Sequence, residues 1–501
     1  MTAARAPTRQ AVARAVSWIG IGHVVSQGMW LASLLVLAAL LSPRDFGTLA
    51  SALVLVNLAG LLVDAGTRGS LIAKPTLTRA DIRGAMVVNG AIGLGATLLI
   101  AALAGPAVRT FAGGGDVAAV RALSVGVFLY ALGICAFALL QKHLRLKQYA
   151  VANIASAVIS SVVAVAAGFL GAGVWALVVR QLLSMGLLSA IAWIGARGLV
   201  PARPAAEPGG RPRALRLRQP QWTGFFLLAA ADFVVLNADV FVVGTLTRAR
   251  GLGLYSLAFT LAFAPLTQIA WQVGRVLFPA AAATRRLRDV GRRTLVSLRL
   301  MALLLAPAVP PVIALAPVLP ELLGRRWAPI VVPFQLLLLA GVGQALVSVI
   351  GESLSGTGNV WFRARINLVW AASMVAALVV LVSADGIRGA ALAHLTLFVP
   401  FGLAYAVAGT RRLGVDARAV AAALRPVAVP VGVEALATAG AALGLQAAGA
   451  STAAAAVTAA LVGAAVVTAL LLRLPSSPLP EGRAVLAEAL QRPAGTAGPR
   501  S

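Results

Sequence analysis

The chain has 501 residues, of which 60% are hydrophobic and 11% are charged, whereas about a quarter of a soluble domain is charged. This composition excludes an ordinary soluble protein, because the apolar runs recur almost from end to end and require a bilayer as solvent. The net charge of +27 does not indicate a nucleic-acid partner. Its basic residues stand in short clusters between apolar runs, as in loops that face a cytoplasm and anionic lipid headgroups.

Fourteen apolar runs are long enough to cross a membrane as helices. A helix needs about 20 apolar residues to cross ~30 Å of hydrocarbon. The first run is too long for the core of a cleavable signal peptide, so it is interpreted as the first span. The sequence therefore predicts an all-α polytopic membrane protein. The expected spans are 16–41, 47–67, 84–108, 118–140, 151–170, 173–195, 221–246, 252–280, 294–316, 329–354, 366–384, 389–409, 422–446 and 452–472.

The basic residues predict how these spans are oriented. With the N-terminus inside, 31 of the 42 Lys and Arg residues fall in inner loops and tails or at the span ends beside them, eight in outer loops or the span ends beside them, and three deeper within spans. A miscounted span would scramble this alternation downstream, and the alternation persists to the end of the chain. We therefore expect an even number of spans, with both termini in the cytoplasm.

A Pro-, Gly- and Arg-rich stretch divides the chain after the sixth span. The six spans that follow echo the first six: Gly47 aligns with Gly253 near one turn, and Asn153 aligns with Asn367 near another. Because six is even, the two copies would share the same topology, as in transporters with parallel repeats. Two pseudo-symmetric lobes of this kind suit alternating access.

These observations predict the domain organisation. The expected parts are a cytoplasmic tail (1–15), an N-lobe (16–195), a basic linker (196–220), a C-lobe (221–410), two extra C-terminal spans (411–473) and a second cytoplasmic tail (474–501).

Several motifs resemble a known family in sequence order. They include "LSPRDFGTLA", "LLVDAG", "LLQKHLRLKQYA", "LNADVFVVGTLTRARGLGLYSLAF", "VGRVLFPA", "LLGRRWAPIVVPFQLLLLAG" and "SLSGTGNVWFRARINL". Together they resemble polysaccharide-transporter flippases, which serve lipopolysaccharide and exopolysaccharide biosynthesis within the multidrug/oligosaccharidyl-lipid/polysaccharide (MOP) superfamily. The similarity covers roughly residues 15 to 410.

The resemblance implies a MOP/MATE-like fold and a transporter rather than an enzyme. It further implies that the chain flips an undecaprenyl-pyrophosphate-linked oligosaccharide across a bacterial plasma membrane for surface polysaccharide assembly. The expected partners are this lipid-linked substrate, membrane lipids, a coupling proton or sodium ion, and polymerase or glycosyltransferase machinery. No cofactor is expected.

Ionisable residues inside the spans are the candidate transport residues, because each costs about 2.5–3.5 kcal/mol to insert and needs a partner or a wet cavity. Asp232 and Asp239 are seven residues apart on the seventh span and share a helix face. Arg180 in the sixth span lies at a depth similar to that of Asp239. The two could form a static lock between the lobes, or a pair that opens when pyrophosphate takes the arginine.

Other polar residues leave two interpretations open. His394 is expected at the equivalent depth of the twelfth span, as a satisfied buried histidine or as a transport residue. Arg275 belongs to a motif that matches the family, or it extends to the headgroups. The remaining candidates lie at inner span ends, as interfacial ion pairs or cavity residues: Asp64, Arg68 and Glu352.

Three other functions were weighed against the flippase. An exporter of small molecules from the same superfamily would favour twelve spans and an acidic cavity. A membrane glycosyltransferase needs an acidic catalytic pair at the membrane surface, and the sequence contains neither such a pair nor a metal-ligand cluster. A non-transporting scaffold would leave the charges within the spans unexplained.

Overall fold

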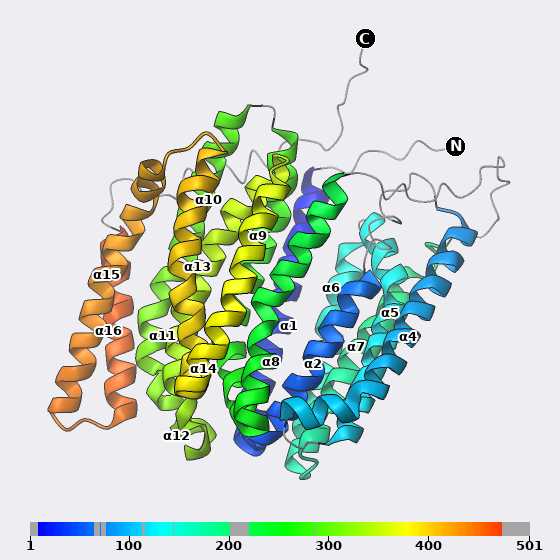
Figure 1. The fold of residues 1–501 in the computed structure, drawn as a ribbon, viewed down its shortest axis with the longest axis horizontal. Helices are drawn as coiled ribbons and strands as arrows, with labels where there is room; N and C mark the ends of the chain where they lie inside the picture. The colour runs from blue at the N-terminus through cyan, green and yellow to red at the C-terminus, as the bar shows by residue number, and fades with distance from the viewer. Residues whose placement is uncertain are drawn as a thin grey trace. The chain divides into compact units, whose positions relative to one another are not determined.

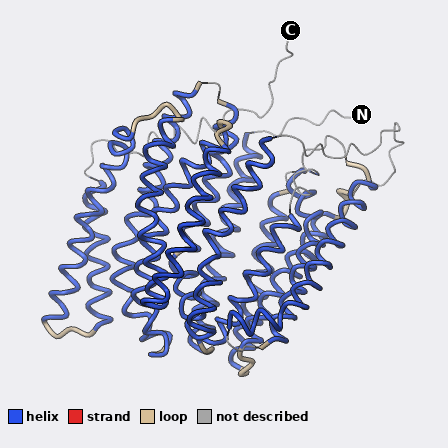
Figure 2. Tube along the Cα trace, in the orientation of Figure 1, coloured by secondary structure: helices blue, strands red, loops and turns tan. Residues whose placement is uncertain are grey.

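The structure is a computed structural model that describes residues 9–64, 71, 77–112, 116–143, 145–200, 220–284 and 286–472. Over these residues the chain is built from helices, short turns and no strand (Figure 2). Ten of the described helical segments are long and apolar enough to cross a membrane, and Val25–Leu40 is a shorter apolar one. The predicted all-helical, multi-pass membrane fold is therefore confirmed.

The chain divides into two compact units. In Figure 1 the first is drawn mostly in blue and cyan, and the second mostly in green to red. Unit 1 comprises Met1–Arg216 and Val243–Ser256, and unit 2 comprises Leu217–Val242 and Leu257–Ser501. The predicted domain boundaries, including those of the two tails and the linker, stay predictions.

Some helices of unit 1 begin where the local sequence supplies a side-chain cap for the free amide groups. At the start of the second helix, Ser42 and Asp45 hydrogen-bond reciprocally, with Ser42 N donating to the Asp45 carboxylate at 2.9 Å. Thr78 and Asp81 form the same pair of hydrogen bonds at the start of the helix that begins at Arg79. The helices are α1 (Arg9–Leu40), α2 (Pro43–Asp64), α4 (Arg79–Ala112), α5 (Val117–Lys142), α6 (Leu146–Phe169) and α7 (Val174–Ala196).

A turn from the long helix α8 (Pro220–Ala262) also belongs to unit 1. The backbone leaves the helical conformation at Arg248, where φ is 60°, between the predicted seventh and eighth spans. A methyl group at Gly253 would overlap the Pro43 carbonyl, and one at Gly47 would overlap the Ala249 carbonyl. The two glycines that the sequence repeat aligned therefore allow these two turns to pack backbone against backbone.

The helices of unit 2 follow the rest of α8. Several short 3-10 segments stand where proline removes an amide donor, as at Ala306–Ala308 and Ala316–Val318. The elements are α9 (Ala264–Ala283), α10 (Leu287–Leu305), η1 (Ala306–Ala308), α11 (Val309–Leu315), η2 (Ala316–Val318), α12 (Leu319–Leu323), η3 (Arg325–Ile330), α13 (Val331–Gly356), α14 (Val360–Ala404), η4 (Tyr405–Gly409), α15 (Ala417–Ala447) and α16 (Thr452–Leu472).

Helix α14 is a hairpin rather than one straight helix. Its backbone breaks at Asp385 and Gly386, where Gly386 adopts a φ of 54° that side chains disfavour. Beyond the break, a methyl group at Gly389 would overlap the Leu381 carbonyl, eight residues earlier. In a continuous helix, residues eight apart lie about 12 Å from one another. The break therefore reverses the chain between the predicted eleventh and twelfth spans.

Where the structure describes them, the residues of the predicted spans fall mainly on helical segments. Two of the long segments, Thr223–Ala262 and Val360–Gly409, contain the backbone breaks described above. Segments of 40 and 50 residues exceed the roughly 20 that a bilayer requires. The exact count of fourteen crossings stays a prediction, because ten segments meet the length and hydropathy criteria as continuous helices.

Candidate functional site

A group of polar side chains from four elements meets in unit 2 among otherwise apolar helices. We call it the Arg363 cluster. It consists of Asp232 on α8, Glu352 and Ser355 on α13, Arg363 and Asn367 on α14, and Tyr405 on η4.

The Arg363 guanidinium lies between two carboxylates. Its Nη1 donates to Glu352 Oε1 at 3.0 Å and to Ser355 Oγ at 2.9 Å. Its Nη2 lies 3.8 Å from Asp232 Oδ2. Glu352 and Ser355 are three residues apart and therefore project from the same side of α13. One arginine thus bridges α8 and α13 across the start of α14.

A second chain of hydrogen bonds holds Asp232 from the other side. Asn367 Nδ2 donates to Asp232 Oδ1, and the Tyr405 hydroxyl donates to Asn367 Oδ1 at 2.6 Å. Tyr405 begins a single turn of π-helix after Pro400, and such turns shift the register of a helix. The π-turn places the buried Tyr405 side chain where it reaches Asn367.

Two glycines make room for these side chains. A methyl group at Gly351 would lie 3.0 Å from Arg363 Nε, and one at Gly274 would lie 3.0 Å from Glu352 Cγ. Both distances are shorter than ordinary carbon contacts. Glycine at these positions therefore lets the guanidinium lie against α13, and lets Glu352 fit between α13 and α9.

The Arg363 cluster is open on its acidic side. The Arg363 side chain is 11% exposed, whereas those of Asp232 and Glu352 are 37% and 28% exposed. When ionised, the two carboxylates and one guanidinium sum to one negative charge. Carboxylate oxygens accept hydrogen bonds from hydroxyl groups or bind cations. This geometry does not present a free cation to an anionic ligand.

A separate buried pair lies two helical turns along α8. The Asp239 carboxylate is 3.3 Å from His394 Nε2, and both side chains are almost fully buried. The imidazole lies with its centre 5.8 Å from the ring centres of Phe259 and Phe263. Asp232 and Asp239 both contact α14, the first on its initial half and the second beyond the break. They therefore do face the same way, as their spacing predicts.

Arg180 belongs to unit 1 and is 5% exposed. Its Nη2 donates to the Trp30 carbonyl at 3.3 Å, and its guanidinium carbon lies 5.0 Å from the centre of the Trp30 ring. A cation over an indole face is stabilised by the ring quadrupole. Helix α1 thus supplies contacts to Arg180 that the sequence did not indicate. The predicted Arg180–Asp239 pair stays a prediction.

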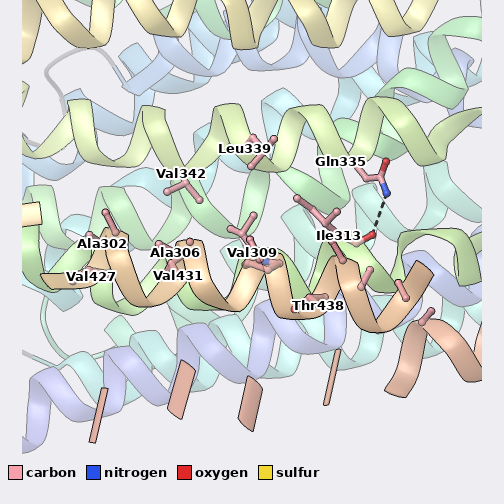
Figure 3. A pocket seen from close by; sticks show the side chains of 18 of the residues that line it. Ala302, Ala306, Val309, Ile313, Gln335, Leu339, Val342, Val427, Val431 and Thr438 are labelled. Atoms are coloured by element: carbon pink, nitrogen blue, oxygen red, sulfur yellow. Dashed lines mark hydrogen bonds between the residues drawn. The ribbon is translucent and has the colours of Figure 1, made fainter. Parts of the chain in front are cut away.

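An apolar cavity of about 760 Å³ lies in unit 2 between α13 and α15. Figure 3 shows Leu339 and Val342 from α13 facing Val431 and Thr438 from α15 across it. Gln335, whose Nε2 donates to the Ile313 carbonyl at 3.1 Å, is one of its few polar lining residues. A cavity of this size and polarity suits a hydrocarbon chain.

The remaining predicted site residues are only partly visible. Asp64 ends α2 and Arg275 lies on α9, but their side chains are outside the described part of the structure. Arg68 lies outside the described residues altogether. The roles of these three residues stay predictions.

Sequence reasoning missed Arg363, Asn367 and Tyr405 as members of one site. Arg363 counted as an inner-loop cation, and Asn367 counted only as a repeat marker. The four-residue spacing of these two was a usable signal, because it places both on one helix face next to an apolar run. Tyr405 gave no such signal, because its direction depends on the π-turn.

Solved structures share this fold at low sequence identity. Lipid II flippase MurJ in an inward closed conformation matches with a TM-score of 0.66 at 13% identity, over 90% of this chain and 97% of that chain. A multidrug resistance MATE family transporter of the MOP superfamily, inward-facing, matches with a TM-score of 0.52 at 16% identity, over 78% of this chain and 94% of that one. The predicted MOP/MATE-like fold is confirmed.

Sequence comparison gives two curated relatives. The succinoglycan biosynthesis transport protein ExoT of Rhizobium meliloti (strain 1021) is 26% identical, and the match spans 63% of this chain and 63% of ExoT. The lipopolysaccharide biosynthesis protein WzxC of Escherichia coli (strain K12) is 26% identical over 72% of this chain and 73% of WzxC. A family model described as polysaccharide biosynthesis protein matches residues 36–332, and the chain therefore belongs to this family.

Proposed function

We propose that the protein is a flippase that moves an undecaprenyl-pyrophosphate-linked oligosaccharide across the bacterial plasma membrane for surface polysaccharide assembly. The family membership and the transport relatives support this function. In this proposal the protein is a transporter and not an enzyme. Both termini face the cytoplasm, where polymerase or glycosyltransferase machinery supplies or receives the glycan.

The observation that carries the proposal is the open acidic side of the Arg363 cluster. An oligosaccharide presents many hydroxyl donors, and the exposed oxygens of Asp232 and Glu352 accept such bonds. Arg363 and Asn367 hold these carboxylates in place, so little order is lost when a sugar binds. The sugar part of the substrate would thus replace water at the cluster.

The other parts of the substrate require other chemistry. Its isoprenoid chain is apolar, and the cavity between α13 and α15 provides a matching surface. Its pyrophosphate needs cations, for which Arg180 remains the proposed partner, and we add Arg68 and Arg275 as further candidates. Arginine suits this role, because its planar group grips phosphate oxygens with two hydrogen bonds.

The buried Asp239–His394 pair is proposed as the switch that links transport to a coupling ion. The Asp239 carboxylate and the His394 imidazole lie 3.3 Å apart, close enough to hold a proton between them. A proton that enters or leaves this pair changes the charge inside the membrane and favours one state of the transporter over the other. A sodium ion is the alternative coupling ion.

The proposal is tested by mass spectrometry of the lipid-linked saccharides in a strain that lacks the gene and has no paralogue able to substitute. We expect one complete undecaprenyl-pyrophosphate oligosaccharide to accumulate while its surface polymer disappears. The wild-type gene should restore the polymer, and the double variant Asp232→Asn with Glu352→Gln should not, at equal protein level. Ser383→Ala, at an exposed position of α14, is the matched control and should restore it. Unchanged lipid intermediates would refute the proposal.

One observation favours a second function, the export of a small organic cation. The net negative charge of the Arg363 cluster suits such a ligand as well as it suits a sugar. The same strain distinguishes the two functions. An exporter would leave the lipid-linked saccharides unchanged and would lower resistance to cationic compounds instead.

A further inference from the structure

Glu434 is a buried carboxyl group near the middle of α15 that none of the functions above uses. Its side chain is 0% exposed, and neither carboxyl oxygen has a hydrogen-bond partner among the described residues. It lies 17 residues after the start of α15 and 13 before its end. In a helix that crosses the membrane, this position is close to the centre of the hydrocarbon.

The surface that covers Glu434 comes from α16, which runs beside α15 (Figure 1). A methyl group at Gly463 of α16 would lie 3.5 Å from Glu434 Cγ and would overlap the Thr438 hydroxyl. That hydroxyl donates to the backbone carbonyl of Glu434 at 2.8 Å. The absence of a side chain at Gly463 thus lets α16 close over the carboxyl group.

Glu434 forms no ion pair within the described part of the chain. Helix α16, η1 and α11 contain no ionisable residue, and the nearest one on α15 is Arg425, nine residues away and exposed. The ionisable residues on the other elements that pack against α15 are Arg288, Asp289, Arg292, Arg293 and Arg299 on α10 and Tyr405 on η4.

An ionised carboxylate at this place would have neither water nor a cation to stabilise it, and such a group binds a proton instead. We propose that Glu434 is a proton-binding site inside the membrane, protonated while α16 packs against α15 and ionised when the two helices separate. The ligand is the proton itself. Ionisation requires that water reach the carboxylate, so it favours the separated state.

The separation of these helices would reshape the apolar cavity. Thr438 donates to the Glu434 backbone carbonyl and also lines the cavity, as does Ala456 of α16. If the cavity takes the isoprenoid chain, which rests on the function proposed above, Glu434 makes lipid entry dependent on pH. A neutral Glu434 keeps the cavity as it is here, and an ionised one opens it toward the lipid.

Labelling with dicyclohexylcarbodiimide tests the proton site directly. This apolar reagent reacts with a protonated carboxyl. The acid proton moves to one nitrogen of the N=C=N unit while the carboxyl oxygen bonds to its central carbon. The acyl group then migrates to nitrogen and leaves a stable acylurea. The full chain in phosphatidylglycerol–phosphatidylethanolamine vesicles would be labelled at a series of pH values and analysed by peptide-resolved mass spectrometry.

We expect Glu434 to be labelled at low pH, with a labelling rate that falls about tenfold per pH unit above its midpoint. Glu434→Gln should abolish this label while the protein stays folded. Glu321, an exposed carboxyl at the start of α12, is an internal control that should react little at any pH. Absent labelling of Glu434 in folded protein, or a rate independent of pH, would overturn the proposal.

Transport in the same vesicles separates this proposal from the flippase function. Wild type should move a labelled undecaprenyl-pyrophosphate oligosaccharide at a rate that depends on pH, and Glu434→Gln should lose most of that dependence. An unchanged pH response in the variant would overturn the role of Glu434 in lipid entry. If wild type transports nothing but Glu434 still titrates, the flippase function fails and the proton site stands.

Discussion

Replacing Arg363 by methionine tests whether the Arg363 cluster is held together by charge. Methionine preserves most of the volume but leaves the carboxylates of Glu352 and Asp232 without their shared cation. Removal of one partner from a fully buried ion pair costs about 3–5 kcal/mol. Because 28% of Glu352 and 37% of Asp232 is exposed, water screens part of this loss, and we expect a destabilisation of about 2–3 kcal/mol.

The free energy of unfolding would be measured by reversible SDS denaturation in mixed micelles. Arg365→Met is the matched control, because Arg365 is exposed and only two residues away, and it should change stability by less than about 0.5 kcal/mol. Adding Asp232→Asn and Glu352→Gln to Arg363→Met should recover most of the loss, since no charge is then left unpaired. Equal costs for Arg363→Met and Arg365→Met, or no recovery in the triple variant, would refute the reasoning.

Two further predictions concern packing and hydrogen bonding. Tyr405→Phe removes the 2.6 Å donor to Asn367 and leaves a buried acceptor unsatisfied, which should cost about 1–2 kcal/mol in the same SDS assay. Gly253→Ala forces a methyl group onto the Pro43 carbonyl and should cost about 1–3 kcal/mol. Gly60→Ala, where a methyl group meets nothing within 4 Å, is its control and should be neutral or slightly stabilising. Equal stability of the two alanine variants would contradict the close approach at Gly253.

The fold could be predicted because a membrane helix requires a run of about 20 apolar residues, and such runs can be read directly from the sequence. The hairpin in α14 could also be predicted, since Asp385 and Gly386 interrupt the apolar sequence within a helical segment of 50 residues. Where a backbone break lies inside one continuous helical segment, however, hydropathy cannot say how many times the chain crosses.

The candidate site was predictable only in its acidic half. Asp232 stands out because a carboxylate inside an apolar run requires an explanation. Arg363 does not, because an arginine near a span end usually extends to the headgroups. Depth along the membrane, on which the predicted Arg180–Asp239 pair rests, does not show which way each helix is turned. The contacts of Arg180 with Trp30 and of Asp239 with His394 depend on that rotation.

The geometry of α8 links the two polar groups of unit 2. Asp232 and Asp239 are seven residues apart, so they lie about 10.5 Å apart along one face of the helix. The first contacts Arg363 and Asn367 before the break in α14, and the second contacts His394 after it. A rigid rotation of α8 that breaks one contact therefore strains the other. Any ligand that binds Asp232 in only one of these states therefore also favours one geometry of the Asp239–His394 contact.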